Sequence, residues 1–425
     1  MRRWLLPAGL LALCSACEDG QVASKDAGRP RPDAQVAPLP QPVDGGLLVF
    51  VAPDRSTDGD GSRARPLGSL VRAYEAVAAG DSVVLLAGDH GEVPAPPRGV
   101  RLVGEGTHAT HVRGPLILDA AQTLEALTFH GALTLAGDAA LVGVALQDSA
   151  APIARVTGPS QWTEVRVTQI TGPEAAVRVE AGGVLTWRGG GLHDLAGGAI
   201  HGEDAQLRLA GLDLSRFAGV GVALDDGTLE VDDLRMHAPV GAGVLITGGR
   251  ATLSRVDVFD PVTDPVLNTA SGFGVTGGEV TVSRSYVRGG DRAFRVAVQG
   301  RLQVVDCVAD APGADGLGVS VGAQGQATGL RVIRPRNAGL AVAGEGAVLG
   351  VADSVVERPG RIGLLVADGA HATTDGLTVT DAANRGVAVL AAGALLSGLV
   401  VERAGDMGEQ ITDATAEVRV RDSTL

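Results

Sequence analysis

Apolar and polar residues alternate along most of the chain, and one alternating motif returns at nearly constant spacing between residues 198 and 411. The motif is a glycine followed by an apolar triplet, as in Gly221-Val222-Ala223-Leu224. Further copies start at residues 243, 339, 363 and 386, so neighbouring copies are 22 (221 to 243), 24 (339 to 363) or 23 (363 to 386) residues apart. A fixed period of this length is typical of a solenoid built from stacked repeats.

Each period contains three short runs with apolar residues at alternate positions, for example Val222-Ala223-Leu224, Leu229-Glu230-Val231 and Leu234-Arg235-Met236. Alternate positions share one face of a β-strand. Asp225-Asp226-Gly227 and Asp232-Asp233 separate the runs and favour turns. Three strands leave no room for a four-stranded propeller blade, and no run has a helical period. The sequence therefore predicts an all-β parallel β-helix, with three-stranded coils of about 22–23 residues that pair from turn to turn.

The composition agrees with this fold. Glycine supplies 62 of 425 residues, and the sequence is 45% hydrophobic but only 3% aromatic, which indicates a core of stacked aliphatic side chains. A solenoid grows along one axis, so the chain length does not require several domains. The net charge of −14 argues against a nucleic-acid partner, because phosphate binding needs a basic face.

Residues 1–17 have the features of a targeting segment. Two arginines precede an apolar stretch of about ten residues, which is too short for an ordinary membrane span. Leu13-Cys14-Ser15-Ala16-Cys17 resembles a bacterial lipoprotein signal, although Cys14 stands where that family usually has leucine. The resemblance implies cleavage before a lipidated Cys17 and anchoring in the bacterial cell envelope, and Glu18 favours the outer membrane. Ordinary secretion after a nearby cleavage is the alternative.

Residues 18–46 are rich in Pro, Ala, Asp and Gln and have no periodicity, so we expect a disordered tether with a reach of about 30 Å. The predicted β-helix domain follows as residues 47–425. The sequence has three cysteines, and two of them, Cys14 and Cys17, lie in the targeting segment. The third is Cys307, which we expect to be a buried thiol.

Residues 47–106 predict the N-terminal start and cap of the coil. A strand at Leu47–Val51 precedes a helical run that begins near Pro66 and ends at Gly80. This region resembles the pectate-lyase-like right-handed β-helix superfamily through Gly59-Asp60-Gly61, Pro66-Leu67-Gly68-Ser69-Leu70, Ala73, Ala76, Ala79-Gly80-Asp81-Ser82-Val83-Val84 and Gly88. The resemblance implies a right-handed coil capped by a short helix. It implies no single activity, because the superfamily mixes enzymes with non-catalytic surface proteins.

In the enzymes of that superfamily, the substrate groove lies outside the first strand of each coil. The outward positions of the first strands are predicted to be Arg155, Arg178, Ile200, Ala223, Leu245, Gly274, Ala297, Ser320, Ala341, Leu365 and Ala388. From Ile200 onward this column contains no charge, so it cannot supply the paired carboxylates of a glycoside hydrolase. We therefore predict no catalytic residue.

The apolar part of this column suggests an interface, with Leu245, Ala297, Ala341 and Leu365 as its main residues, because a long exposed apolar strip usually marks a contact surface. The alternative is that the flanking corner loops cover the strip.

Two charged groups are further candidates for binding. Glu203, Asp204, Asp225 and Asp226 lie at the corner after the first strand in successive coils and could hold calcium; solvated turns are the alternative. The loops after the third strand carry Arg336, Arg361 and Arg385, together with Arg288, Arg292, Arg334 and Arg358. These arginines could bind anionic sugars, or they could pair with nearby carboxylates. His108 and His111 are assigned to a loop and given no role.

The hypothesis that follows is a lipid-anchored envelope β-helix that binds a partner, either an anionic polysaccharide or an envelope protein. The alternative is a divergent polysaccharide lyase or another carbohydrate-active enzyme, distinguished by carboxylates and arginines gathered in one groove. No cofactor other than calcium is predicted.

Overall fold

A computed structural model describes residues 46–53, 59–265, 269–412, 418–421 and 424. The predicted signal segment, Cys17 and all of the predicted tether except Gly46 lie outside the described residues. Those described belong to one compact unit. Among them, no helix is long and apolar enough to cross a membrane.

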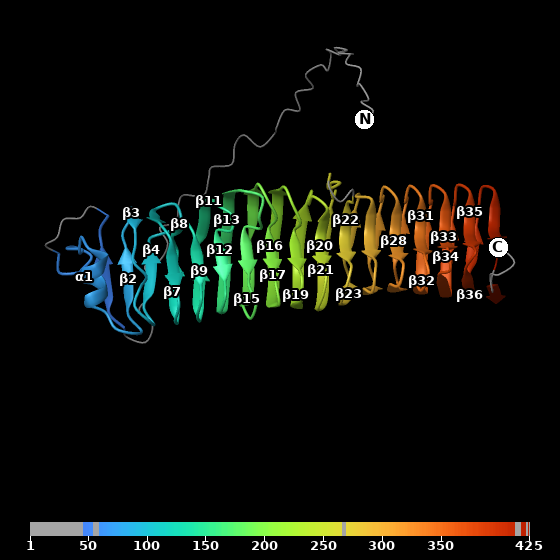
Figure 1. Ribbon diagram of the computed structural model, residues 1–425. Helices are drawn as coiled ribbons and strands as arrows, with labels where there is room; N and C mark the ends of the chain where they lie inside the picture. Colours follow the sequence, from blue (N-terminus) through green and yellow to red (C-terminus); the bar gives the residue numbers. More distant parts are fainter. Residues whose placement is uncertain (1–45, 54–58, 266–268, 413–417, 422–423, 425) are drawn as a thin grey trace, which may run out of the picture. The chain divides into compact units, whose positions relative to one another are not determined.

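The described chain is a coil of parallel strands stacked turn upon turn along one axis (Figure 1), which confirms the predicted right-handed parallel β-helix. The first strand of every turn joins a 14-stranded sheet. Its members are β6 (Leu116–Leu118), β9 (Leu133–Leu135), β12 (Ala154–Val156), β14 (Val177–Val179), β16 (Ile200–Gly202), β18 (Val222–Leu224), β20 (Ala242–Ile246), β22 (Ser271–Val275), β25 (Arg292–Val296), β28 (Asp315–Ser320), β31 (Ala338–Ala343), β33 (Ile362–Ala367), β35 (Arg385–Leu390) and β38 (Met407–Thr412).

The second and third strands of the turns form a 25-stranded sheet, because in the middle turns they run on as one long bent strand. The bent strands are β13 (Pro159–Thr171), β15 (Val184–Leu195), β17 (Ala205–Phe217), β19 (Gly227–His237), β21 (Arg250–Phe259), β32 (Val348–Glu357) and β34 (His371–Thr380). The shorter members are β1 (Leu48–Val51), β2 (Ser82–Leu85), β3 (Gly88–Glu92), β4 (Arg101–Gly104), β5 (Thr110–Arg113), β7 (Gln122–Glu125), β8 (Thr128–His130), β10 (Ala139–Val142), β11 (Ala145–Ala150), β23 (Glu279–Ser283), β24 (Tyr286–Arg288), β26 (Arg301–Val305), β27 (Val308–Asp310), β29 (Gln324–Thr328), β30 (Arg331–Ile333), β36 (Gly393–Ser397), β37 (Val400–Glu402) and β39 (Val418–Arg421).

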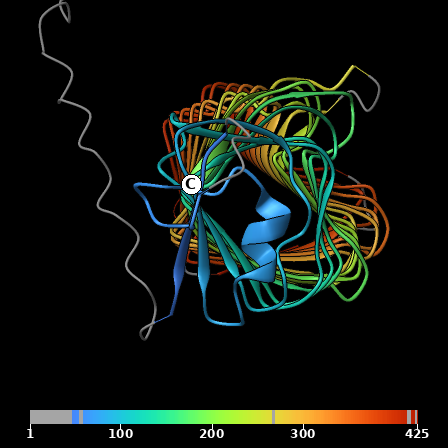
Figure 2. The same ribbon diagram turned by 90° about the vertical axis from the view of Figure 1, so that its left-hand side faces the viewer.

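One short helix, α1 (Leu70–Glu75), lies across the N-terminal end of the coil, as the end-on view in Figure 2 shows. Ser69 caps it by accepting a hydrogen bond from the Arg72 backbone N–H, and Ala73 is the buried residue of the helix. The helix is shorter than predicted, because Leu67 exchanges backbone hydrogen bonds with β1 instead of joining the helix.

The core consists of inward side chains stacked along the axis, mostly Val, Leu, Ile and Ala. Aromatic residues stack in two places: Trp162 on Trp187, with ring centroids 4.7 Å apart, and Phe273 on Phe294, with centroids 5.3 Å apart. Cys307 is completely buried, and burial raises the pKa of its thiol to about 11.

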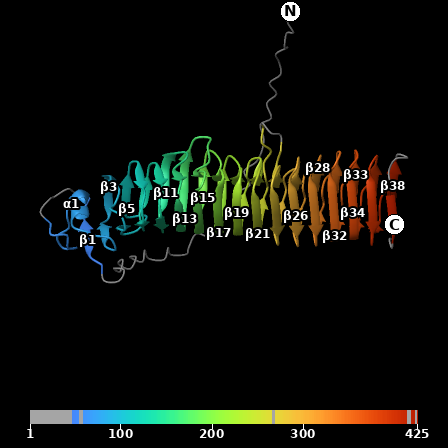
Figure 3. The same cartoon turned by 60° about the horizontal axis from the view of Figure 1, so that its bottom comes forward.

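Two corners of nearly every turn are made by a residue with left-handed backbone geometry. The first such column, between the second and third strands, is Gly143, Glu164, Gly189, Gly211, Asp233, Arg255, Arg284, Asp306, Gly329, Asp353, Gly376 and Gly398. The second column, directly after the third strand, is Asp148, Gln169, Asp194, Arg216, Ala238, Asp260, Gly289, Ala311, Arg334, Arg358, Asp381 and Arg403. Because the bend recurs at the same place, equivalent corners of neighbouring turns follow one another along the stack (Figure 3).

Candidate functional site

The outward column of the first strands differs from the predicted one. Strand register aligns these residues in successive turns: Ile117, Thr134, Arg155, Arg178, His201, Ala223, Leu245, Gly274, Arg295, Gly318, Ala341, Leu365, Ala388 and Gln410. We call this set the first-strand column.

Three predicted members of the column were wrong. Ile200 is only 1% exposed and points inward, because a shift of one residue in a strand moves a side chain to the opposite face. Ala297 and Ser320 lie two residues beyond the true positions, and Ala297 is 7% exposed at a corner. A shift of two residues preserves the alternation, so the pattern alone could not detect it. With His201 and Arg295 in their places, the column is not free of charge.

The apolar residues of the column do not form the exposed strip on which the interface prediction rested. Leu245, Ala341 and Leu365 are half-buried, and Ala388 is fully buried. The last three pack with Ala338 and Ile362 in a small apolar cluster separate from the main core. These packing partners lie on the first strands themselves and not on the corner loops, and the interface stays a prediction.

In the N-terminal part of the column, each base pairs with an acid of the next turn. Arg155 Nη1 lies 2.8 Å from Glu180 Oε1, and Arg178 Nη2 lies 2.9 Å from Glu203 Oε2. His201 Nε2 lies 2.9 Å from Asp225 Oδ2. We call these three pairs the ion-pair ladder.

The ladder bears on the predicted calcium site. Burial alone would raise the pKa of Asp225, but hydrogen bonds from His201 and Thr247 lower it. Glu203 likewise has Arg178 as its partner, and Asp204 and Asp226 are exposed. Among the described residues, no group of three or more His, Cys, Asp or Glu side chains is arranged to hold a metal ion. The calcium site stays a prediction.

The arginines of the loops after the third strand fall into two groups. Three of them pair with a carboxylate: Arg288 with Asp260 at 2.5 Å, Arg292 with Asp315 at 3.1 Å, and Arg334 with Asp310 at 2.7 Å. Arg358 has an electrostatic interaction with Asp381. For these residues, the predicted alternative of local pairing is correct.

Arg336, Arg361 and Arg385 form the second group, which we call the arginine row. They have no hydrogen-bond or ion-pair partner in the described part of the chain, and the Arg385 Nε atom is buried without one. Arg336 and Arg361 are exposed, whereas Arg385 is half-buried. The Arg385 backbone N–H donates to the Arg361 carbonyl at 2.9 Å, and that of Arg361 donates to the Asn337 carbonyl at 3.0 Å. The three arginines thus occupy successive turns in a diagonal line.

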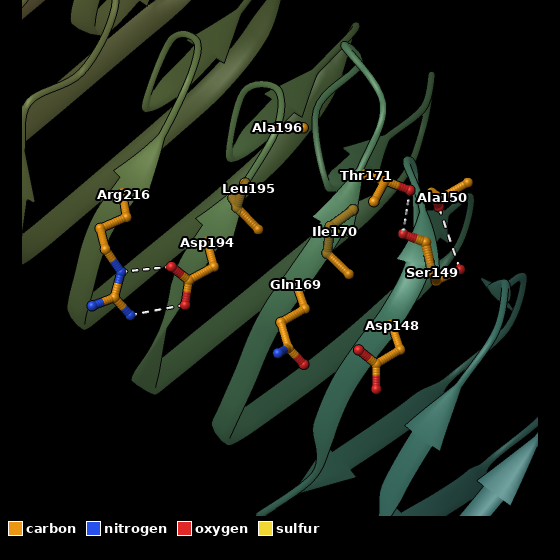
Figure 4. Close-up of a pocket in the computed structure, with 10 residues that line it drawn as sticks. All are labelled: Asp148, Ser149, Ala150, Gln169, Ile170, Thr171, Asp194, Leu195, Ala196 and Arg216. Atoms are coloured by element: carbon orange, nitrogen blue, oxygen red, sulfur yellow. Dashed lines mark hydrogen bonds and ion pairs between the residues drawn. The ribbon is translucent and has the colours of Figure 1, made fainter.

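A groove on the third-strand side was not predicted from the sequence. Figure 4 shows Asp148, Gln169, Asp194 and Arg216 in one row along successive strands, at consecutive positions of the second left-handed column. Arg216 donates two hydrogen bonds to Asp194, at 2.6 and 2.8 Å, and these lower the pKa of that carboxyl group. The signal in the sequence was the polar residue repeated after each third strand.

The wall of this third-strand groove is partly apolar: Ile170 and Leu195 lie at its floor and are nearly buried. On the neighbouring outward position, His193 Nδ1 lies 2.7 Å from Ser215 Oγ and 3.9 Å from Asp213 Oδ1. The groove can therefore donate and accept hydrogen bonds, but its one arginine is already engaged by Asp194.

No protein-family model matches this chain, and no curated protein matches it. Several solved structures do. A GH87 α-1,3-glucanase catalytic unit from Streptomyces thermodiastaticus is 12% identical, with 88% of this chain and 69% of that chain covered and a TM-score of 0.34. Tailspike protein 3 of bacteriophage CBA120 is 13% identical, with 91% and 64% covered and a TM-score of 0.36. A PL6 alginate lyase in complex with a trisaccharide is 11% identical, with 89% and 88% covered and a TM-score of 0.27. The fold assignment rests on the strand pairing of the chain itself.

Proposed function

We propose that this protein is a polysaccharide-binding β-helix of the bacterial cell envelope, and that it holds an anionic polysaccharide along the arginine row. The observation that carries the proposal is the absence of any carboxylate partner for Arg336, Arg361 and Arg385 within the described residues. A guanidinium group binds a carboxylate through two parallel hydrogen bonds, so it suits an acidic sugar.

The spacing of the row supports a polymeric ligand. Successive turns of the coil lie about 4.8 Å apart, so the three guanidinium groups can meet successive parts of an extended chain. Asn384 is exposed beside Arg385 and adds an amide donor. The rest of the protein is acidic, with a net charge of −14, which makes an uncompensated basic row distinctive.

The test is affinity electrophoresis through polygalacturonate or alginate, with neutral dextran as the comparison polymer. The variant Arg336→Gln, Arg361→Gln, Arg385→Gln should bind the acidic polymers at least tenfold more weakly, since hydrogen bonds to charged groups contribute about 1.5–3 kcal/mol each. The matched control changes Arg216, Arg288 and Arg403 to Gln; these arginines are exposed but paired. Equal binding by both triple variants, or equal retardation in dextran, would contradict the proposal.

Envelope anchoring is a separate part of the proposal, in which Cys17 carries the lipid. Cys17→Ser should abolish acyl labelling and membrane fractionation, whereas Cys14→Ser should leave both intact. Equal labelling of the Cys17→Ser protein would refute anchoring through this residue.

A second candidate function is catalysis on a polysaccharide in the third-strand groove. It is favoured by Asp148, which lines the groove without an arginine partner and lies 3.3 Å from His130. Release of reducing ends or unsaturated products from acidic polysaccharides, lost in Asp148→Asn, would support this function. Intact polymer after prolonged incubation would leave binding as the function.

A further inference from the structure

Two histidines meet on the outer face of the third strands near the N-terminal end of the coil. His111 lies on β5 and His130 on β8, and their rings stack with centroids 5.5 Å apart. His111 Nδ1 and His130 Nε2 are 3.3 Å apart. His111 had been assigned to a loop; it lies instead on a strand, with its side chain half-buried.

We propose that His111 Nδ1 and His130 Nε2 together bind one divalent transition-metal ion of the zinc, nickel or copper class. Zinc binds imidazole nitrogen at about 2.0–2.1 Å, and two such bonds at a tetrahedral angle place the nitrogens about 3.4 Å apart. The observed separation of 3.3 Å is therefore close to the separation that one bound ion needs.

A carboxylate prepares His130 for this role. His130 Nδ1 lies 3.3 Å from Asp148 Oδ2, and the carboxylate favours the tautomer with the proton on that nitrogen and the lone pair on Nε2. Metal-binding histidines commonly donate their second N–H to a carboxylate in this way, which fixes the tautomer and makes the ligand more basic. In the tautomer that leaves the His130 Nε2 lone pair free, His111 Nδ1–H donates to His130 Nε2. When a metal ion binds His111 Nδ1, that proton moves to His111 Nε2 through solvent, and the ring stays neutral.

The surrounding charges also favour a cation. Asp89, Arg113 and Asp148 are the charged groups beside the pair, and Arg113 is engaged by Asp89 at 2.8 Å. Two carboxylates and one guanidinium group leave a net negative charge around the two rings.

Two protein ligands leave open coordination positions. Among the described residues, no third His, Cys, Asp or Glu side chain completes a metal-binding group here. We therefore expect weaker binding than at a closed structural zinc site, with water in the open positions.

Isothermal titration of the full chain, purified without a polyhistidine tag, with Zn²⁺ or Ni²⁺ tests the site. Wild type should bind one ion per chain, because the two imidazole nitrogens lie at the separation that one ion needs. His111→Asn and His130→Asn should each abolish this binding, and Asp148→Asn should weaken it about tenfold.

His193→Asn is the matched control, because His193 lies on the same face with Ser215 and Asp213 as its neighbours. It should bind the metal as wild type does. Thermal unfolding of each variant without metal checks that the variant is folded. Because His111 and His130 are replaced in separate variants, one folded variant of the two is enough to test the site. The proposal fails if wild type binds no ion, if a folded His111→Asn or His130→Asn binds as wild type does, or if His193→Asn loses binding equally.

Discussion

The turns that carry the ion-pair ladder and those that carry the arginine row use the same strands but place their acids differently. In the ladder, an acid follows two residues after the outward strand residue, as Glu180, Glu203 and Asp225 show, and each binds the base of the preceding turn. The equivalent positions in the later turns hold Ala343, Ala367 and Leu390. The arginines of the row stand at or before the opposite end of the strand, where no carboxylate of the described residues pairs with them.

The comparison shows that pairing, rather than the number of arginines, decides which surface can bind an anion. Exposed ion pairs contribute only about 0–1 kcal/mol to folding. The ladder therefore does little for stability, but it leaves Arg155, Arg178 and His201 with their hydrogen-bonding capacity partly used. The arginine row keeps that capacity for a ligand.

The largest effect is expected when a carboxylate is introduced into the arginine row. Asn384 lies on the turn next to Arg361, so Asn384→Asp should engage a guanidinium group and weaken binding of alginate about fivefold or more. Affinity electrophoresis measures the change, with Asn384→Ser as the neutral control. If Asp and Ser weaken binding to the same extent, the loss comes from the amide and not from charge pairing.

A smaller effect is expected when the ladder is released from its acids. The variant Glu180→Gln, Glu203→Gln, Asp225→Asn leaves Arg155, Arg178 and His201 without carboxylate partners, so it should bind alginate more tightly, by about twofold to threefold at low salt. Raising the ionic strength should remove the gain, since exposed charges are screened. An unchanged affinity at low salt would show that free guanidinium groups alone do not create a binding surface.

Stability should respond in the opposite direction from binding at Arg385. A buried donor without a partner costs about 1–3 kcal/mol, so Arg385→Met should raise the free energy of unfolding by about 1 kcal/mol while it weakens polysaccharide binding. Urea denaturation gives the value. Arg361→Met, at an exposed site, is the control and should change stability by less than about 0.5 kcal/mol. Destabilisation by Arg385→Met would contradict this account.

The smallest effect concerns a pair outside both regions. The hydrogen bond from Arg216 lowers the pKa of Asp194, so Arg216→Gln should raise that pKa towards its ordinary value. A lowered folded-state pKa contributes stability above the unfolded-state pKa, and the contribution is lost as the pH falls through the folded-state value. Wild type and variant should therefore differ slightly at neutral pH and converge in acid. NMR titration of the Asp194 carboxyl carbon checks the shift; identical titration curves would mean that the pair is not formed in solution.

The fold could be predicted from the sequence because side chains that point into the core must be apolar. The alternation of apolar and polar residues therefore marks the inward positions and their period. Outward positions carry no such constraint, and Ala297 and Ser320 were misplaced by two residues because that shift keeps the same alternation. The arginine row was predicted from its position in the loops, but pairing of Arg288 and Arg334 depends on side-chain geometry. The contact between His111 and His130 was not predicted, because the two residues are 19 positions apart. The repeat of about 22–23 residues seen in the later turns does not place residues at that interval side by side.

The two columns of left-handed residues have a consequence for how the molecule can change in length. The chain bends in the same way at the equivalent corners of neighbouring turns. A complete turn can therefore be removed or duplicated without altering any bend. Excision of residues 339–362, from one motif glycine to the residue before the next, would shorten the stack by about 4.8 Å and rejoin equivalent positions. Binding surfaces that extend over several turns can thus be lengthened or shortened in steps of one turn.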